Sequence, residues 1–350
     1  MRPAAILLLA LYSGLLHAAD HGVILLYHHV SELTPASTSV TPDQFRQQLD
    51  YLVQEQFTVL PLAQMLDRIY AGESLPDRSV AISFDDAYLS VFTEAWPQLQ
   101  KRRMPFTVFV STRAVDEGYA QTMSWQQMQS MDPALADFGA HSLSHAYLVR
   151  AGADESPGQW RQRGRTEIDA SVARLEQALG RRVRSFAYPY GEYVAPLAQH
   201  LQSKNLYGLA QHSGAVDAGT PPQQIPRFPL AQGHADMDRF ITALNARPLP
   251  ILNRNMDSTL LPDGRQTEQL KLRLGVGPFR PQELACYSSD GTALVINWQG
   301  ATATVQLPDL KPGRNKINCT APSTERAGEF FWYSRLWILP PVARTWSFDQ

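Results

Sequence analysis

The sequence has little of what marks several common classes of protein. Only 2 of its 350 residues are cysteine, 18% are charged, and the formal net charge is -2. Without a basic excess or a run of Lys or Arg, the chain has no electrostatic reason to bind nucleic acid or an anionic membrane surface. No apolar run beyond the first twenty residues approaches the ~20 residues needed to span a bilayer. What remains is an ordinary globular composition that can bury one large core or two smaller ones.

The first 19 residues have the layout of a secretory signal peptide. Arg2 precedes the apolar stretch AAILLLALYSGLL, and the small residues Ala18 and Ala19 precede a cleavage point at Asp20 or one residue earlier. The alternative is an uncleaved membrane anchor, which the shortness of the apolar stretch disfavours. We therefore expect an exported protein, periplasmic or secreted, that loses residues 1–19 and has no transmembrane segment afterwards.

Both cysteines, Cys286 and Cys319, lie in the last quarter of the chain. Export delivers thiols to an oxidising compartment, so an even number of cysteines in one small region favours a disulfide over a metal site. We expect these two residues to be bonded to each other; the alternative is two free, buried thiols.

Residues 20–247 alternate between predicted strands and predicted helices. About seven strands, beginning with GVILLYHHV at Gly22–Val30, are separated by helical stretches such as TPDQFRQQLDYLVQEQF. This alternation predicts an α/β fold, with parallel strands in an incomplete or distorted (β/α) barrel. In such folds the functional side chains gather at the carboxyl ends of the strands.

Residues 248–350 differ in composition and hydrophobic periodicity from the residues before them. Pro and Gly become frequent, and short alternating stretches such as LKLRLGV and ALVINW replace helical periodicity. We expect a linker followed by a small all-β sandwich. The aromatic residues between Phe330 and Trp337 alternate along the chain, which favours a strand that packs in the core. A sugar-stacking surface is the alternative.

Three stretches at predicted strand ends carry side chains suited to chemistry: SFDDAY, HSLSH and YPYG. Asp85 and Asp86 follow a buried strand, while His141 and His145 at i and i+4 predict two imidazoles on one face of a helical turn. One carboxylate and two imidazoles leave metal coordination positions open, as in catalytic sites. Taken singly, an acidic pair is usually a helix cap and a histidine pair a packed or solvated pair. Together, in one domain, they point to a metal centre.

These stretches resemble the first three signature motifs of the polysaccharide deacetylases, the NodB-homology group of carbohydrate esterase family 4. The similarity covers roughly residues 22–245, and the forms ILLYHHV and FAYPYGEY are nearest to the exported biofilm-polysaccharide deacetylases. The resemblance implies a distorted (β/α) barrel and a divalent metal, most often zinc, held by Asp86, His141 and His145.

The same resemblance implies how the remaining motif residues act. Asp85 would be the general base that takes a proton from the attacking water. The backbone N–H of Tyr190, which follows Pro189, would donate to the oxyanion of the substrate. A metal ion beside the pair would allow both Asp85 and Asp86 to stay charged.

The chain also departs from the family pattern. Ala87 replaces a common glycine, and Ala187 and Tyr188 stand where many members have an arginine before Pro-Tyr-Gly. The fourth and fifth motifs, an Asp-Trp element and Leu-x-His, have no clean equivalents.

Three residues are candidates for the missing parts. His212, in LAQHSG, is a candidate general acid, and Arg227, in IPRFPL, is a candidate replacement for the missing positive charge. His28 and His29 end the first strand, and we expect one of them, His28 foremost, either to contact substrate or to make a structural hydrogen bond.

The resulting hypothesis is a metal-dependent hydrolase that removes N-acetyl groups from a polysaccharide containing N-acetylglucosamine. An O-acetyl esterase and a non-catalytic glycan-binding protein on the same scaffold are the alternatives. The sequence leaves open the polymer, the choice among zinc, cobalt, nickel and iron, and the oligomeric state.

Overall fold

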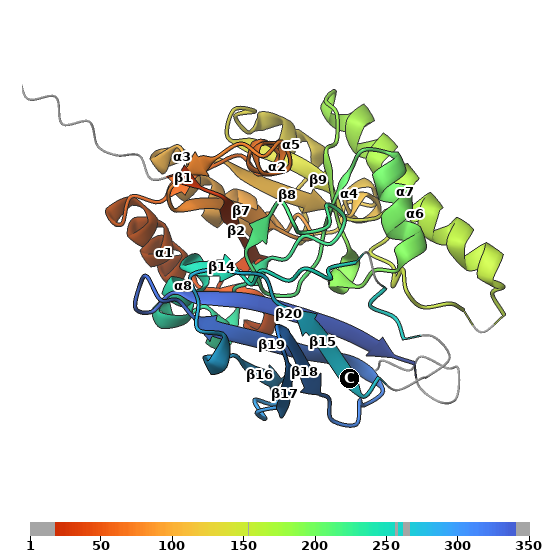
Figure 1. The fold of residues 1–350 in the computed structure, drawn as a ribbon. Coiled ribbons are helices and arrows are strands. Elements are labelled where there is room, and N and C mark those ends of the chain that lie inside the picture. Colours follow the sequence, from red (N-terminus) through yellow and green to blue (C-terminus); the bar gives the residue numbers. More distant parts are fainter. Residues whose placement is uncertain (1–17, 153, 256–257, 262–266, 341–350) are drawn as a thin grey trace, which may run out of the picture.

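The computed structural model describes residues 18–152, 154–255, 258–261 and 267–340. A curled sheet surrounded by helices forms one half of the molecule, and two further sheets lie against it (Figure 1). Residues 1–17 of the predicted signal peptide lie outside the described residues. Its last two residues form β1 (Ala18–Ala19), which pairs antiparallel with β6 (Leu75–Pro76).

The curled sheet contains nine strands, of which seven follow one another in parallel. In sheet order these seven are β13 (Phe228–Pro229), β2 (His21–Tyr27), β7 (Ser79–Phe84), β8 (Phe106–Val110), β9 (Ala136–Ala140), β10 (Ser185–Ala187) and β11 (Tyr207–Leu209). The short strands β5 (Thr58–Val59) and β12 (Val216–Asp217) pair with β7 and β2. The expected distorted barrel of about seven parallel strands is confirmed.

A single segment, residues 225–229, brings the two edges of the curled sheet together. Ile225 forms a parallel bridge with Leu209 at the end of β11, and the Arg227 N–H donates to the His212 carbonyl at 3.0 Å. The next residue, Phe228, pairs with Leu25 of β2. Because one segment contacts both edges, the position of Arg227 is fixed at the seam of the barrel.

Eight α-helices are described in this structure, most of them packed around the curled sheet (Figure 1). They are α1 (Pro42–Gln54), α2 (Leu62–Tyr70), α3 (Trp96–Arg102), α4 (Thr112–Asp116), α5 (Trp125–Ser130), α6 (Pro157–Leu179), α7 (Ala195–Ser203) and α8 (Met237–Leu244). Capping boxes at Thr41 and Ser156 begin α1 and α6, each followed by proline at the first helical position. Gly180, with φ 65°, ends α6 in the left-handed conformation that glycine adopts readily.

Local structure differs from the sequence prediction in two places near the strand ends. The first strand ends at Tyr27 and a separate two-residue strand, β3 (His29–Val30), pairs with β4 (Ser39–Val40), so His28 lies between the two. The helix expected after the acidic pair begins with a π-helical turn, Val91–Ala95, ahead of α3. Both deviations occur shortly after the carboxyl ends of β2 and β7.

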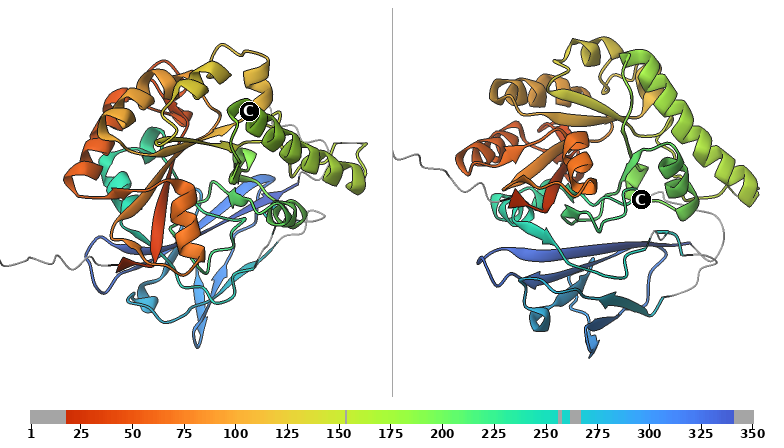
Figure 2. Two further views of the ribbon diagram at one scale, coloured as in Figure 1. Left: turned by 90° about the horizontal axis from the view of Figure 1, so that it is seen from above. Right: turned by 45° about the horizontal axis from the view of Figure 1, so that its top comes forward.

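The C-terminal part forms two sheets, as the sandwich prediction implied. A four-stranded sheet has the order β14 (Ala246–Pro248), β20 (Phe330–Leu339), β19 (Gly313–Pro322), β16 (Ala285–Ser288). A three-stranded sheet has the order β15 (Gln269–Arg273), β18 (Thr302–Gln306), β17 (Ile296–Gln299). The four-stranded sheet lies between the barrel and the three-stranded sheet (Figure 2).

Strand β20 belongs to two hydrophobic cores because its side chains alternate between its faces. Leu336 and Ile338 pack in the barrel core, where Trp332 also contacts Phe228 edge to face. Phe331, Trp337 and Leu339 pack in the sandwich core. The aromatic cluster is therefore mainly core, and it fastens the sandwich to the barrel.

Cys286 and Cys319 form the expected disulfide, joining directly paired residues of β16 and β19. The bridge closes a loop of 33 residues within the sandwich. Among the residues that the structure describes, no helix is long and apolar enough to cross a membrane.

We predict that replacing both cysteines with alanine lowers the free energy of unfolding by about 2 to 4 kcal/mol, since cross-linking a loop of this length restricts the unfolded chain. The measurement is urea denaturation followed by tryptophan fluorescence. A double variant as stable as the oxidised wild-type protein would contradict a stabilising role for the bridge.

Candidate active site

The three predicted motifs meet at the carboxyl ends of neighbouring parallel strands. Asp85 and Asp86 follow β7, His141 follows β9, and the Pro189–Gly191 turn follows β10. Parallel strands end at the same edge of a sheet, so side chains distant in sequence converge there.

Asp86, His141 and His145 form a compact group whose potential ligand atoms all lie within 4.8 Å of one another. His145 Nε2 lies 3.2 Å and His141 Nε2 3.4 Å from Asp86 Oδ1. Burial works to raise the pKa of Asp86, but the two imidazoles hold it well below its usual value. The two nitrogens and one oxygen aimed at a common point are donors that suit zinc and several other divalent metals.

His141 is oriented for such a role by its second ring nitrogen. Its Nδ1 lies 2.8 Å from the Ala187 carbonyl at the end of β10, a contact that places the proton on Nδ1 when the ring is neutral. Its Nε2 is buried and has no hydrogen-bond partner among the described residues. A buried polar atom without a partner is costly, and a metal ion at this point would satisfy it. The residues therefore fit a metal ion.

The conformation that brings the two histidines together is not the expected helical turn. Residues 141–147 contain no helix, and Ser142 and His145 have φ values of 63° and 56°. Asp86, Ala87 and Tyr190, in the other two motifs, also have positive φ. Left-handed backbone at a non-glycine residue costs on the order of 1–2 kcal/mol, so the surrounding structure has to hold these turns in place. The helical-turn prediction was wrong because spacing at i and i+4 does not by itself specify a helix.

Glu167 of α6 holds the histidine loop in this conformation. Its carboxylate accepts hydrogen bonds from the Ser144 N–H at 2.8 Å and the Ser144 hydroxyl at 2.7 Å, and its backbone carbonyl accepts one from Leu143. Sequence analysis did not identify this residue, although an acidic residue on the buried face of an amphipathic helix is the signal that marks it.

Asp85 is completely buried and forms a bidentate ion pair with Arg227. Arg227 Nη1 donates to Oδ1 at 2.7 Å and Nη2 donates to Oδ2 at 2.8 Å. Burial works to raise the pKa of Asp85, but the charge of Arg227, with a smaller contribution from His141, holds it below its usual value. The structure thus brings Arg227, the candidate replacement for the missing positive charge, next to Asp85. Its role there stays a prediction.

Gln211 supplies a further hydrogen bond to the same carboxylate. Its Nε2 donates to Asp85 Oδ2 at 3.2 Å. The close approach of the Gln211 backbone requires Gly191, since a Cβ at that position would lie 2.5 Å from the Gln211 nitrogen. The carboxylate of Asp85 offers about four lone-pair directions, so three hydrogen bonds leave it able to accept one more.

The Pro189–Gly191 turn places Tyr190 beside the metal group. Pro189 is buried at the first position of this short 3₁₀-helix, where its fixed φ fits, and Tyr190 has φ 60° and ψ 5°. The Tyr190 ring packs edge to face on His145 with ring centroids 4.7 Å apart. Its N–H lies in the first turn of the helix, where amides have no partner inside the helix. No hydrogen bond from that amide is described in the structure.

Arg314, on β19 of the sandwich, reaches the same turn from the other half of the molecule. Its Nη1 donates to the Tyr190 carbonyl at 2.6 Å and to Glu192 Oε1 at 3.0 Å. Glu192 is fully buried and also accepts from Arg150 Nη2 at 3.2 Å. Nothing in the sequence distinguishes Arg314 from other surface arginines, and it was not predicted.

An aromatic stack continues this network to the metal group. The Arg150 guanidinium lies 3.3 Å from the centroid of the Tyr147 ring, which stacks on Tyr190 with centroids 3.9 Å apart. The stack and the ion pairs hold the turn, and with it the Tyr190 amide, in one position relative to His145.

His28 and His212, the remaining predicted histidines, have different surroundings. His28 lies close enough to the site that its charge acts on Asp85, Asp86 and His145. The structure brings His28 into the electrostatic neighbourhood of the metal group.

His212 faces a pocket between the barrel and the sandwich. Its ring lies 6.5 Å from that of Tyr193. Burial, with the charges of Lys316 and Arg335, lowers the pKa of His212 to about 3. An imidazole with this pKa is neutral near pH 7, whereas a general acid has to carry its proton there. The role of His212 as acid stays a prediction that its surroundings do not favour.

Residues 72–209 match the family model described as polysaccharide deacetylase. A poly-beta-1,6-N-acetyl-D-glucosamine N-deacetylase of Staphylococcus epidermidis is 24% identical over 195 residues, covering 54% of this chain and 67% of its own length. The protein of Escherichia coli K12 with the same description is 24% identical over 257 residues, covering 63% of this chain but only 38% of its own length.

Two solved structures share the fold. The Streptococcus pyogenes deacetylase PplD in complex with acetate has a TM-score of 0.58 and 23% identity, covering 64% of this chain and 98% of that one. IcaB from Ammonifex degensii has a TM-score of 0.51 and 27% identity, covering 62% of this chain and 94% of that one. The resemblance inferred from the three motifs is confirmed by these matches.

We predict that substitutions of Asp85 and Arg227 have non-additive effects on the free energy of unfolding. Arg227→Met leaves a buried carboxylate without its cation and should lower the free energy of unfolding by about 3 to 5 kcal/mol. The double variant Asp85→Asn/Arg227→Met removes both charges and should lose less than the sum of the two single variants. Urea denaturation of the four proteins measures the coupling, and single-variant losses that add within about 0.5 kcal/mol would contradict it.

Proposed function

We propose, from the premise that this chain carries a polysaccharide deacetylase domain, that it is a metal-dependent hydrolase removing N-acetyl groups from a polysaccharide containing N-acetylglucosamine. The observation that carries the proposal is the triangle of Asp86, His141 and His145 directly beside a buried, ionised Asp85. The relatives named as poly-beta-1,6-N-acetyl-D-glucosamine N-deacetylases support that polymer as the substrate class.

Asp86, His141 and His145 would hold the metal ion, with zinc as the proposed ion. A divalent ion bound there supplies a Lewis acid and lowers the pKa of a bound water molecule. Burial, together with the charge of His141, lowers the pKa of His145 to about 4, so that its ring is neutral and free to act as a ligand near pH 7.

Asp85 accepts the proton of the attacking water in this proposal. The bidentate Arg227 contact keeps the carboxylate ionised and fixes its plane, and Gln211 restricts it further. The Tyr190 amide donates to the oxygen of the acetyl group as negative charge develops on it, which lowers the barrier for attack.

His28 is the histidine that we propose as proton donor to the departing amine. The sequence suggested His28 only for a substrate contact or a structural hydrogen bond. The proposal is supported by the charge of His28, which acts on Asp85, Asp86 and His145. His212, in contrast, has four cationic neighbours that oppose its protonation, Lys316, Arg335, Arg254 and Arg227.

Export of the protein is proposed on two observations. The first residues have the layout of a signal peptide, and the Cys286–Cys319 bridge is of the kind that persists in oxidising compartments. Exopolysaccharides and cell-wall glycans are accessible in those compartments.

We predict that the purified protein releases acetate from β-1,6-linked N-acetylglucosamine oligomers. A chelator should abolish the release, and added zinc should restore it. Asp85→Asn should lower kcat by at least about 10²-fold, the usual contribution of a positioned base, while one metal ion per chain remains bound. Acetate and bound metal are measured on the same samples.

Acetylated xylan and β-1,4-linked N-acetylglucosamine oligomers are the comparison substrates. Acetate from xylan alone would replace the proposal with an esterase. Retained glycan binding without any acetate release, unaffected by Asp85→Asn, would replace it with a binding protein.

We predict that His28→Gln lowers kcat far more than His212→Gln, since the charge of His28 acts on Asp85, Asp86 and His145, whereas burial and cationic neighbours oppose protonation of His212. The expected loss for His28→Gln is about 10²- to 10⁴-fold, with metal content unchanged. An equal or larger loss for His212→Gln, at unchanged thermal stability, would instead assign the proton transfer to His212.

A further inference from the structure

The two histidines of the metal group are held in different ways. The His141 N–H donates to the Val110 carbonyl at the end of β8 at 2.9 Å, and its ring nitrogen Nδ1 lies 2.8 Å from the Ala187 carbonyl. The residue is also completely buried. The ends of β8 and β10 therefore fix this ligand without help from the loop that follows it.

His145 lacks both kinds of support. It lies outside the helices and strands of the structure, with φ 56°, and its side chain is 29% exposed. Its ring contacts the rings of His141 and Tyr190, with centroids 4.9 and 4.7 Å apart, and no hydrogen bond of its Nδ1 is described among the residues of this structure. The second nitrogen of a metal-binding histidine usually makes a hydrogen bond that orients the ring. The position of this ligand therefore depends on the backbone that carries it.

Helix α6 holds that backbone with the side chains of one helical face. Trp160, Arg163 and Glu167 follow one another at spacings of three and four residues, so they lie on the same face of the helix. Trp160 Nε1 donates to the Leu148 carbonyl at 2.8 Å, and Arg163 Nη2 donates to the Arg150 carbonyl at 2.6 Å. These two contacts hold the far end of the histidine loop.

Glu167 makes the contact that lies directly beside His145 in the chain. Its Oε2 accepts from the Ser144 N–H at 2.8 Å, and its Oε1 accepts from the Ser144 hydroxyl at 2.7 Å. Its backbone carbonyl accepts from the Leu143 N–H at 3.0 Å. A carboxylate that accepts from both donors of one residue leaves that residue little freedom to rotate. Because this residue precedes His145, the same contact fixes the backbone from which the imidazole projects.

We propose that Glu167 is a positioning residue, which sets the affinity of the metal group for a divalent ion by holding His145 within reach of Asp86. The inference rests on the metal group of the proposed function, but it concerns binding of the ion and not release of acetate. Without this contact His145 occupies its binding position for only part of the time, while His141 keeps its own supports. The apparent affinity for the ion then falls in proportion to that fraction.

The test is the zinc affinity of the full chain, measured by competition with a metallochromic chelator. Glu167→Ala should weaken zinc binding about 10- to 100-fold, the usual range for partners of metal ligands. Glu167→Gln should bind zinc within about threefold of the wild-type protein, because an amide can both accept from the Ser144 N–H and donate to its hydroxyl. Ser144→Ala removes one of the two side-chain contacts and should also weaken binding, so it serves where Glu167→Ala does not fold.

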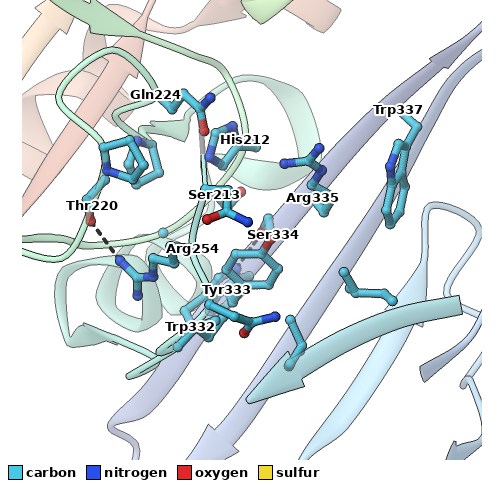
Figure 3. A pocket seen from close by; sticks show the side chains of 18 of the residues that line it. His212, Ser213, Thr220, Gln224, Arg254, Trp332, Tyr333, Ser334, Arg335 and Trp337 are labelled. Atoms are coloured by element: carbon cyan, nitrogen blue, oxygen red, sulfur yellow. Dashed lines mark hydrogen bonds between the residues drawn. The ribbon is translucent and has the colours of Figure 1, made fainter. Parts of the chain in front are cut away.

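Three further variants show whether the effect passes through His145. In a His145→Ala background, Glu167→Ala should cause no additional loss of zinc affinity, since the ligand that it positions is already absent. Glu176→Ala removes another carboxylate of α6, which accepts from the Val183 N–H at 3.0 Å before the amino end of β10, and should leave zinc affinity unchanged. His212→Gln is the histidine control, because His212 lies in the pocket between the barrel and the sandwich (Figure 3) and should not affect zinc affinity.

Thermal unfolding without metal verifies that each variant is folded. If Glu167→Ala binds zinc as tightly as the wild-type protein, or loses as much affinity when His145 is absent, the inference is overturned and the proposed function stands. Zinc binding that depends on Glu167 in a protein that releases no acetate would support the inference and refute the proposed function. A wild-type chain that binds no divalent metal would overturn both.

Discussion

The buried pair of Asp85 and Arg227 is the interaction on which the arrangement of this molecule depends. Arg227 belongs to the segment that closes the curled sheet between β11 and β2, and Asp85 ends the strand next to β2. Two fully buried charges are tolerated only when they are paired with good geometry. The segment that closes the barrel therefore also carries the side chain that orients the proposed base.

Much of this architecture can be predicted from the sequence, because it follows from local patterns. Alternating strands and helices give the barrel, and the three motifs at strand ends give Asp85, Asp86, His141 and His145. Arg227 was a candidate only because the place before Pro-Tyr-Gly lacks its arginine. Two cysteines in one small region of a chain that was expected to be exported sufficed to predict the disulfide.

What could not be predicted depends on contacts between distant segments. The spacing of the two histidines suggested a helical turn, but Glu167 holds a left-handed loop instead. Gln211 and Arg314 act through single long-range hydrogen bonds that leave no periodic pattern in the sequence. Sequence reasoning named only His212 as a candidate general acid, because the electrostatic surroundings of His28 and His212 appear only when the chain is folded.

The hydrogen bond from Arg314 to the Tyr190 carbonyl makes the C-terminal sheets part of the support of the site in the barrel. Arg314 pairs with the buried carboxylate of Glu192, which lies 122 residues earlier in the chain. The same side chain fixes the turn that carries the proposed oxyanion donor. A fragment that stops after the barrel would retain every signature motif yet leave that turn without one of its two arginine supports. The proposed catalytic unit therefore comprises the barrel together with the sheet that contains β19. The sandwich cannot be exchanged freely for another domain, because Arg314 would be lost with it.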